Sequence, residues 1–116
     1  GLGDVYKRQT IETTEDGLYK KHRISRAPLP SERYKIMKKL NWHYKFISIE
    51  PILQFKLEKF IKWVKHINPC LIYVGYDNYN NKLPEPTLEQ TQKLINKLSR
   101  LTTVYTKTIR EAWYRT

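Results

Sequence analysis

The sequence has 116 residues, with 22 lysines and arginines against 11 acidic residues, a net charge of +11 and one cysteine. Its length allows one domain or part of one, and 40% hydrophobic residues indicate a folded segment rather than a disordered tail. A single cysteine excludes an intramolecular disulfide framework and any self-contained four-cysteine metal or iron–sulfur site.

Membrane and secretory segments are not expected. No apolar run approaches the roughly 20 residues that a membrane helix needs, and the N-terminus has no apolar signal region. The longest uninterrupted apolar run, residues 70–75, has the length of a strand. We therefore expect no membrane segment and a cytoplasmic location.

The first nine residues, Gly1-Leu2-Gly3-Asp4-Val5-Tyr6-Lys7-Arg8-Gln9, lack helical periodicity. They resemble a translated adaptor or vector read-through that recurs in conceptual translations from environmental (metagenomic) sequencing. We expect residues 1–9 to be a non-native leader. The alternative is an ordinary basic N-terminal arm.

The first predicted elements are a strand, a loop and a helix. Residues 10–13 are typical of the end of a strand, and the polar, turn-rich residues 14–30 predict a loop. Ser31 is expected to cap a helix over residues 31–40. Ile36, Met37 and Leu40 share its apolar face with the aliphatic stem of Arg33.

A strand, a helix and a second strand follow. Residues 45–49 are rich in β-forming types, and Pro51 ends this strand. Residues 57–67 carry apolar side chains at helical spacing, and Asn68-Pro69 ends the helix. The continuous apolar run 70–75 predicts a strand buried on both faces, with Cys70 as a buried, inert thiol.

The last predicted elements are a helix, a strand and the start of a helix. Residues 76–86 predict a loop, after which Thr87 and Gln90 have the spacing of a capping box. Apolar residues continue the helix to Leu101, and residues 102–106 predict a strand. Residues 109–113 are expected to begin a last helix.

The order β-α-β-α-β-α-β, with strands 25 to 32 residues apart, predicts successive β-α-β units and an α/β fold with about four parallel strands and flanking helices. Such strands belong either to a doubly wound sheet or to a piece of a β/α barrel. Periodicity does not choose between these two architectures.

Candidate site residues lie at the predicted carboxyl ends of the strands, where parallel α/β folds bind ligands. These ends carry Glu12, Glu50, the segment Gly75-Tyr76-Asp77-Asn78, and Lys107. Three acidic groups and a cation at one edge suit hydroxyls, amines or a ribose. The alternative is that each residue only caps a loop or pairs with a nearby lysine.

Other chemistries have weaker support. His22, His43 and His66 lie at no ligand spacing and are expected at the surface. No glycine-rich phosphate loop is present, which places a phosphate-binding barrel enzyme last among the functions considered.

The basic charge allows two interpretations. Lys56, Lys59, Lys62 and Lys65 recur every three residues on one predicted helix, as on a solvated helix face. Residues 19–23 and 76–82 mix aromatic or amide groups with cations, a combination that can stack bases and hold phosphates. A small basic nucleic-acid-binding α/β module is therefore the alternative function.

Six segments carry a family resemblance through their order and spacing. They are Thr10-Ile11-Glu12-Thr13, Ser25-Arg26-Ala27-Pro28-Leu29-Pro30-Ser31-Glu32-Arg33, Ile47-Ser48-Ile49-Glu50-Pro51-Ile52-Leu53, Tyr73-Val74-Gly75-Tyr76-Asp77, Leu83-Pro84-Glu85-Pro86 and Val104-Tyr105-Thr106-Lys107-Thr108. Together they resemble the C-terminal portion of a radical S-adenosylmethionine (radical SAM) protein. The nearest type is the group related to spore photoproduct lyase and to phage-associated radical SAM proteins.

The resemblance implies that residues 10–116 are the C-terminal part of a partial (β/α)6 TIM-like barrel. In that family, a [4Fe–4S] cluster on an N-terminal Cys-x3-Cys-x2-Cys motif cleaves S-adenosyl-L-methionine to a 5′-deoxyadenosyl radical. This motif is absent here, so cluster and catalysis would need a missing N-terminal barrel half, and the chain alone would be inactive. Family substrates include nucleic-acid lesions, proteins and small molecules.

The same resemblance makes Glu12, Ser48, Glu50 and Asp77 the candidate cofactor- or substrate-binding residues. Relatives often have Asp near the positions of Gln54 and Lys56, where this sequence has none. An acidic role for this turn is therefore not expected.

Overall fold

The computed structural model describes residues 6–22, 24 and 26–115. Its elements are, in chain order, β1 (Lys7–Thr10), α1 (Asp16–His22), α2 (Pro30–Lys39), β2 (Lys45–Ile49), α3 (Leu57–Ile67), β3 (Leu71–Val74), α4 (Leu88–Ser99), β4 (Thr103–Thr106) and the short 3-10 helix η2 (Trp113–Arg115). No helix in these residues is long and apolar enough to cross a membrane.

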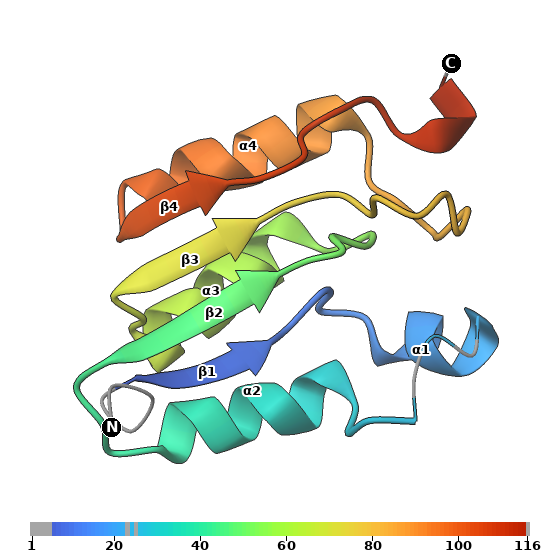
Figure 1. The fold of residues 1–116 in the computed structure, drawn as a ribbon. Helices are drawn as coiled ribbons and strands as arrows, with labels where there is room; N and C mark the ends of the chain where they lie inside the picture. The colour runs from blue at the N-terminus through green and yellow to red at the C-terminus, as the bar shows by residue number, and fades with distance from the viewer. Residues whose placement is uncertain (1–5, 23, 25, 116) are drawn as a thin grey trace.

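The four strands form one parallel sheet in the order β1-β2-β3-β4 (Figure 1). Neighbours in the sheet are therefore neighbours in the chain, and the strand order never reverses. A doubly wound sheet reverses its order at a switch point. Among the described residues, the sheet is instead singly wound and has no such switch point.

The core lies on one face of this sheet. Ile47, Ile49, Ile72 and Val74 are almost fully buried and join a cluster with the apolar sides of α2, α3 and α4. Figure 1 shows α3 and α4 behind the strands. In β2 and β3, the residues between these buried positions point to the other face and are only half-buried. The prediction that residues 70–75 are buried on both faces is therefore wrong, because helices cover only one face.

Two helices confirm the sequence patterns closely. In α3 the apolar stripe is buried, and Asn68 ends the helix in a left-handed conformation with its N–H bonded to Val64. In α4 the capping box forms as expected, with reciprocal bonds between Thr87 and Gln90. Local sequence patterns were therefore sufficient to predict the end of α3 and the start of α4.

The region before β2 differs from the prediction. Residues 16–22, expected in a loop, form α1, and the first strand covers residues 7–10 rather than 10–13. It thus begins inside the expected leader. Ser31 does not cap α2, because the N-cap position is Leu29, whose side chain makes no cap bond. The Ser31 hydroxyl and N–H both bond to Asp16.

The buried face of α2 matches the prediction at Arg33 and Met37 and differs from it at Ile36. Ile36 is 55% exposed, whereas Arg33, Tyr34 and Met37 are buried. Tyr34 stacks on Trp63 of α3, with ring centroids 4.5 Å apart, and its hydroxyl bonds to His66. Aromatic packing between the helices thus decides which face of α2 turns inward.

At the amino ends of the strands, the environment of Cys70 differs from the prediction. Cys70 is exposed, and its thiol contacts the carbonyl of Lys45, so the expected buried thiol is wrong. Lys45 is buried instead, and its ammonium donates to the carbonyls of Met37 and Ile67, near the ends of two helices. These carbonyls replace the water that the ammonium loses, while burial lowers the pKa of Lys45.

A buried ion pair fastens the C-terminal segment. Arg110 donates two bonds to the Glu85 carboxylate, at 2.9 and 2.7 Å, and one to the carbonyl of Asp77. Glu85 also accepts the N–H of Trp113. Residues 109–112 therefore form an irregular strap and not the expected helix, and only the short η2 begins at Trp113.

We expect Glu85→Ala to destabilise the chain by roughly 2–4 kcal/mol. A broken buried pair costs about 3–5 kcal/mol, and the partial exposure of Arg110 reduces this cost. Urea denaturation measures the change, with Glu111→Ala as the exposed control, for which the expected change is within about 0.5 kcal/mol. Equal effects of both substitutions would contradict a structural role for this pair.

Candidate functional site

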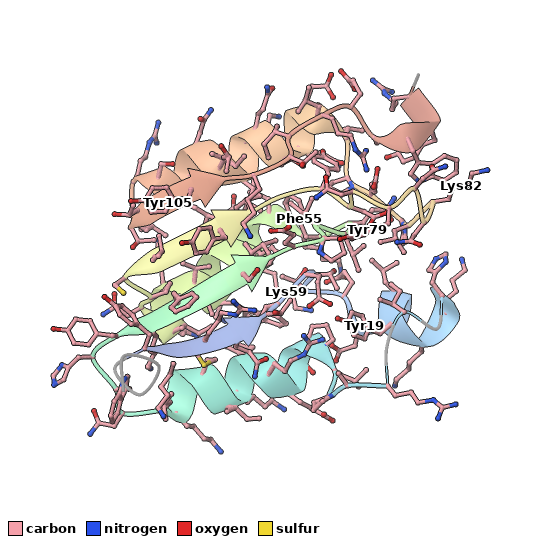
Figure 2. The ribbon with its side chains drawn as sticks, in the orientation of Figure 1. Tyr19, Phe55, Lys59, Tyr79, Lys82 and Tyr105 are labelled. Atoms are coloured by element: carbon pink, nitrogen blue, oxygen red, sulfur yellow. The ribbon has the colours of Figure 1, made fainter. Side chains whose placement is uncertain are left out.

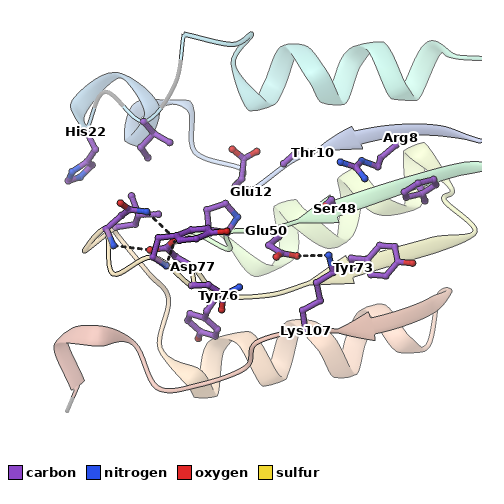
Figure 3. Close-up of a pocket in the computed structure, with 17 residues that line it drawn as sticks. Arg8, Thr10, Glu12, His22, Ser48, Glu50, Tyr73, Tyr76, Asp77 and Lys107 are labelled. Atoms are coloured by element: carbon purple, nitrogen blue, oxygen red, sulfur yellow. Dashed lines mark hydrogen bonds and ion pairs between the residues drawn. The ribbon is translucent and has the colours of Figure 1, made fainter. Parts of the chain in front are cut away.

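A cavity of about 990 Å³ lies at the carboxyl edge of the sheet and extends over its uncovered face (Figure 3). It brings together all four candidate residues, Glu12, Ser48, Glu50 and Asp77, which come from three different strand ends. Lys107, at the end of the fourth strand, lines it as well. The expectation that the strand ends meet at one edge is therefore confirmed.

Glu50 is the candidate carboxylate whose bonding is least complete. Its Oε2 atom is buried and accepts no hydrogen bond. The Lys107 ammonium lies 3.4 Å from this oxygen, an ion pair without hydrogen-bond geometry (Figure 3). A buried carboxylate oxygen without a donor is costly, so Glu50 has spare capacity to accept a bond from a ligand.

Gly75 makes room for this pair. A Cβ atom at Gly75 would lie 3.2 Å from the Lys107 Cβ and 3.4 Å from the Glu50 carboxyl group. Gly75 has no positive φ that would require glycine. The close approach of Glu50 and Lys107 therefore accounts for the missing side chain.

Aromatic rings continue the cavity wall along the uncovered face. The rings of Phe46 and Tyr73 lie 6.2 Å apart, and those of Tyr73 and Tyr105 lie 5.7 Å apart. Figure 2 shows Tyr105 on the side of the sheet away from α4. The Lys107 ammonium sits 5.3 Å from the centre of the Tyr73 ring. Glu50 and Tyr73 thus contact the same cation.

Glu12, in contrast, is already held by the protein. Its carboxylate accepts a bond of 2.9 Å from Arg33, and both side chains are buried. Arg33 also donates to the Thr10 carbonyl, the Pro28 carbonyl and the Tyr19 hydroxyl. The guanidinium therefore joins β1, α1 and α2, and Glu12 serves mainly as its counterion.

Burial raises the pKa of Glu12, and the charge and hydrogen bond of Arg33 offset only part of this effect. Nearby Glu15 behaves differently. Burial alone would raise its pKa, but a bond from Thr14 and the ammonium groups of Lys59 and Lys56 lower it. The two carboxyl groups thus respond to pH in opposite senses.

Asp77 organises its own loop. Its two carboxylate oxygens accept the N–H groups of Tyr79 and Asn81 and the side-chain amide of Asn81. The alternative of a loop cap therefore fits Asp77 better than a ligand role. Ser48 lies on the uncovered face, and within the described residues its hydroxyl has no hydrogen bond.

Sequence reasoning missed Tyr73 as part of the site and the buried guanidinium of Arg33. The strand pattern could have revealed Tyr73, because it lies two residues before Gly75 on the same strand as Ile72 but on the opposite face. The helical spacing places the aliphatic stem of Arg33 on the apolar face of its helix but does not predict a buried guanidinium, since arginine is normally exposed. Its burial follows from the way α1 and α2 pack together.

Metal ligands are not gathered in this region. Among the described residues, no group of three or more His, Cys, Asp or Glu side chains is placed to hold a metal ion. His22 lines the cavity, whereas His43 and His66 lie outside it. All three are exposed, as expected.

The opposite pKa shifts of Glu12 and Glu15 predict opposite pH effects on stability. The contribution of Glu12 is present below its unfolded pKa near 4.5 and is lost as pH rises through its higher folded pKa. The contribution of Glu15 is present above its unfolded pKa and is lost as pH falls through its lower folded pKa.

Between about pH 3 and about pH 7, and relative to the unmodified chain, the unfolding free energy of Glu12→Gln should therefore rise as pH increases above about 4.5, and that of Glu15→Gln should fall as pH increases up to about 4.5. Urea denaturation across this range measures both differences. Each variant serves as the control for the other. Differences of the same sign would contradict these assignments.

No protein-family model, curated protein or solved structure matches this chain. The function must therefore be argued from the cavity itself. Its distinguishing feature is a concave, aromatic and polar wall that carries one incompletely bonded carboxylate, Glu50.

Proposed function

We propose that the chain from β1 onward forms the C-terminal part of a radical SAM barrel and supplies part of the wall that binds cofactor and substrate. The single winding of the sheet supports this proposal, because a β/α barrel is built from sequential parallel strands with all helices outside. The uncovered face would then line the barrel interior. The cavity lies at the carboxyl ends of the strands, where barrel enzymes bind their substrates.

The observation that carries the proposal is the buried Oε2 atom of Glu50, which lacks a hydrogen-bond donor. S-adenosylmethionine offers ribose hydroxyls and an amino group, which are donors suited to such an oxygen. The Ser48 hydroxyl on the same strand is available to assist. Each hydrogen bond to the charged carboxylate would contribute roughly 1.5–3 kcal/mol.

The iron–sulfur cluster does not fit the residues of this chain. Cys70 is the single cysteine and lies just before β3, at the edge of the sheet opposite the cavity. Under the proposal, the cluster ligands lie in a missing N-terminal barrel half. That half would also pair with β1 or β4, whose outer edges have no neighbouring strand among the described residues.

Glu50→Gln in the full-length parent tests the assignment. The substitution keeps the size of the side chain but weakens its hydrogen-bond acceptance, so we expect production of 5′-deoxyadenosine to fall by about tenfold or more. Glu58→Gln, on the exposed outer side of α3, is the matched control and should leave the rate unchanged. Iron content must equal that of the unmodified enzyme.

Unchanged 5′-deoxyadenosine production and substrate turnover in Glu50→Gln would overturn this role. An upstream coding sequence without three cysteines at the family spacing would overturn the family assignment. The two results are independent, because the first concerns one residue and the second concerns the missing half.

The alternative function, binding of single-stranded nucleic acid, is favoured by a different observation. Phe46, Tyr73 and Tyr105 form a row of rings across three adjacent strands, on the face that no helix covers. Lys107 lies beside this row. Bases stack on such rings while cations neutralise phosphates.

A gel shift with single-stranded oligonucleotides tests this alternative. Stacking contributes about 1–3 kcal/mol per base, so Tyr105→Ala should weaken binding by roughly tenfold at constant salt. Lys62→Met on α3 is the control and should leave the affinity unchanged. Equal binding by Tyr105→Ala and the unmodified chain would show only generic electrostatic attraction.

A further inference from the structure

We propose that the Glu50 carboxylate and the Tyr73 ring form a binding site for organic cations, and that the Lys107 ammonium occupies this site when no ligand is bound. The ligand class comprises ammonium and sulfonium groups. This inference goes beyond the proposed function, since it concerns the charge of the ligand and holds whichever reaction the parent performs.

The contacts of Lys107 define the recognition chemistry. Its ammonium lies 3.4 Å from the Glu50 Oε2 atom and 5.3 Å from the centre of the Tyr73 ring. An aromatic face attracts cations within about 6 Å of its centre, and a neighbouring carboxylate adds direct Coulomb attraction. The two groups therefore form a small cation-binding site, which the Lys107 ammonium occupies in this structure.

Gly75, which directly follows β3, has no side chain that would obstruct this site. A Cβ atom there would press against both Lys107 and Glu50. The rest of the site opens into the cavity of about 990 Å³, which is large enough for a ligand much larger than the ammonium itself (Figure 3). A ligand can thus place its cationic group at Glu50 and its remainder along the sheet.

The bonding of Lys107 is weak enough for exchange. Its side chain is 55% exposed, and the buried oxygen that it faces receives no hydrogen bond from it. Exposed ion pairs of this kind are weak. The buried Glu12–Arg33 pair offers a contrast, because its hydrogen bonds with several elements fix it in place.

The other carboxylates of the cavity are not available to a cation. Glu12 is paired with Arg33, and Asp77 is bonded to the N–H groups of its own loop. Within the described part of the cavity, Glu50 is therefore the carboxylate that a ligand can reach by displacing the half-exposed Lys107 side chain. Lys107 acts as a competitor of the ligand.

The test compares choline with its neutral isostere 3,3-dimethyl-1-butanol, titrated into the full 116-residue chain and followed by the NMR signals of Gly75 and the Tyr73 ring. A competitor that fills a site nine-tenths of the time weakens ligand binding about tenfold. Lys107→Met should therefore tighten choline binding by roughly tenfold and leave the binding of the neutral isostere unchanged.

Two further variants isolate the cause. Lys62→Met, on the exposed side of α3, removes the same charge far from the cavity and should leave choline binding unchanged. Glu50→Gln combined with Lys107→Met should abolish the gain. Equal tightening by both lysine variants, or no tightening by Lys107→Met, would overturn the proposal, because the effect would then come from net charge or be absent.

The outcome is separable from the test of radical chemistry. Choline binding requires neither the cluster nor the missing barrel half. A tenfold gain in Lys107→Met, with unchanged 5′-deoxyadenosine production in Glu50→Gln of the parent, would retain the cation site and reject the proposed function. The reverse pair of results would reject the cation site alone.

Discussion

One-sided winding of the sheet is the constraint on which the other features depend. Each crossover places its helix on the same face, so Ile47, Ile49, Ile72 and Val74 are buried there and the opposite face has no helical cover. The parallel direction of the strands also brings their carboxyl ends to one edge. The cavity forms where this edge meets the uncovered face.

Burial separates the ion pairs of the molecule into two kinds. Arg33 with Glu12 and Arg110 with Glu85 are hydrogen-bonded and largely enclosed, and each joins segments that are distant in the chain. Such planar, multiply bonded guanidinium groups fix geometry. Lys107 instead faces Glu50 without a hydrogen bond and is half-exposed. A ligand can therefore displace the flexible ammonium, whereas the two guanidinium groups hold distant segments of the chain together.

The sequence predicted the strands after residue 44, the helix over residues 57–67 and the capping box of Thr87, because these depend on local periodicity and local hydrogen bonds. It missed α1, the strap at residues 109–112 and the exposure of Cys70. These features depend on partners far along the chain, such as Glu85 for Arg110. For the site, it named the strand-end residues but could not separate Asp77, a loop cap, from Glu50.

The residue pattern alone was therefore enough to establish alternating parallel strands and helices and to bring Glu12, Glu50, Asp77 and Lys107 to one edge of a sheet. Only the packed structure decided that the sheet is singly wound, since periodicity is identical for both windings. It also decided which carboxylate stays open to a ligand. That property depends on the donors around each oxygen, and those donors come from segments that only folding brings together.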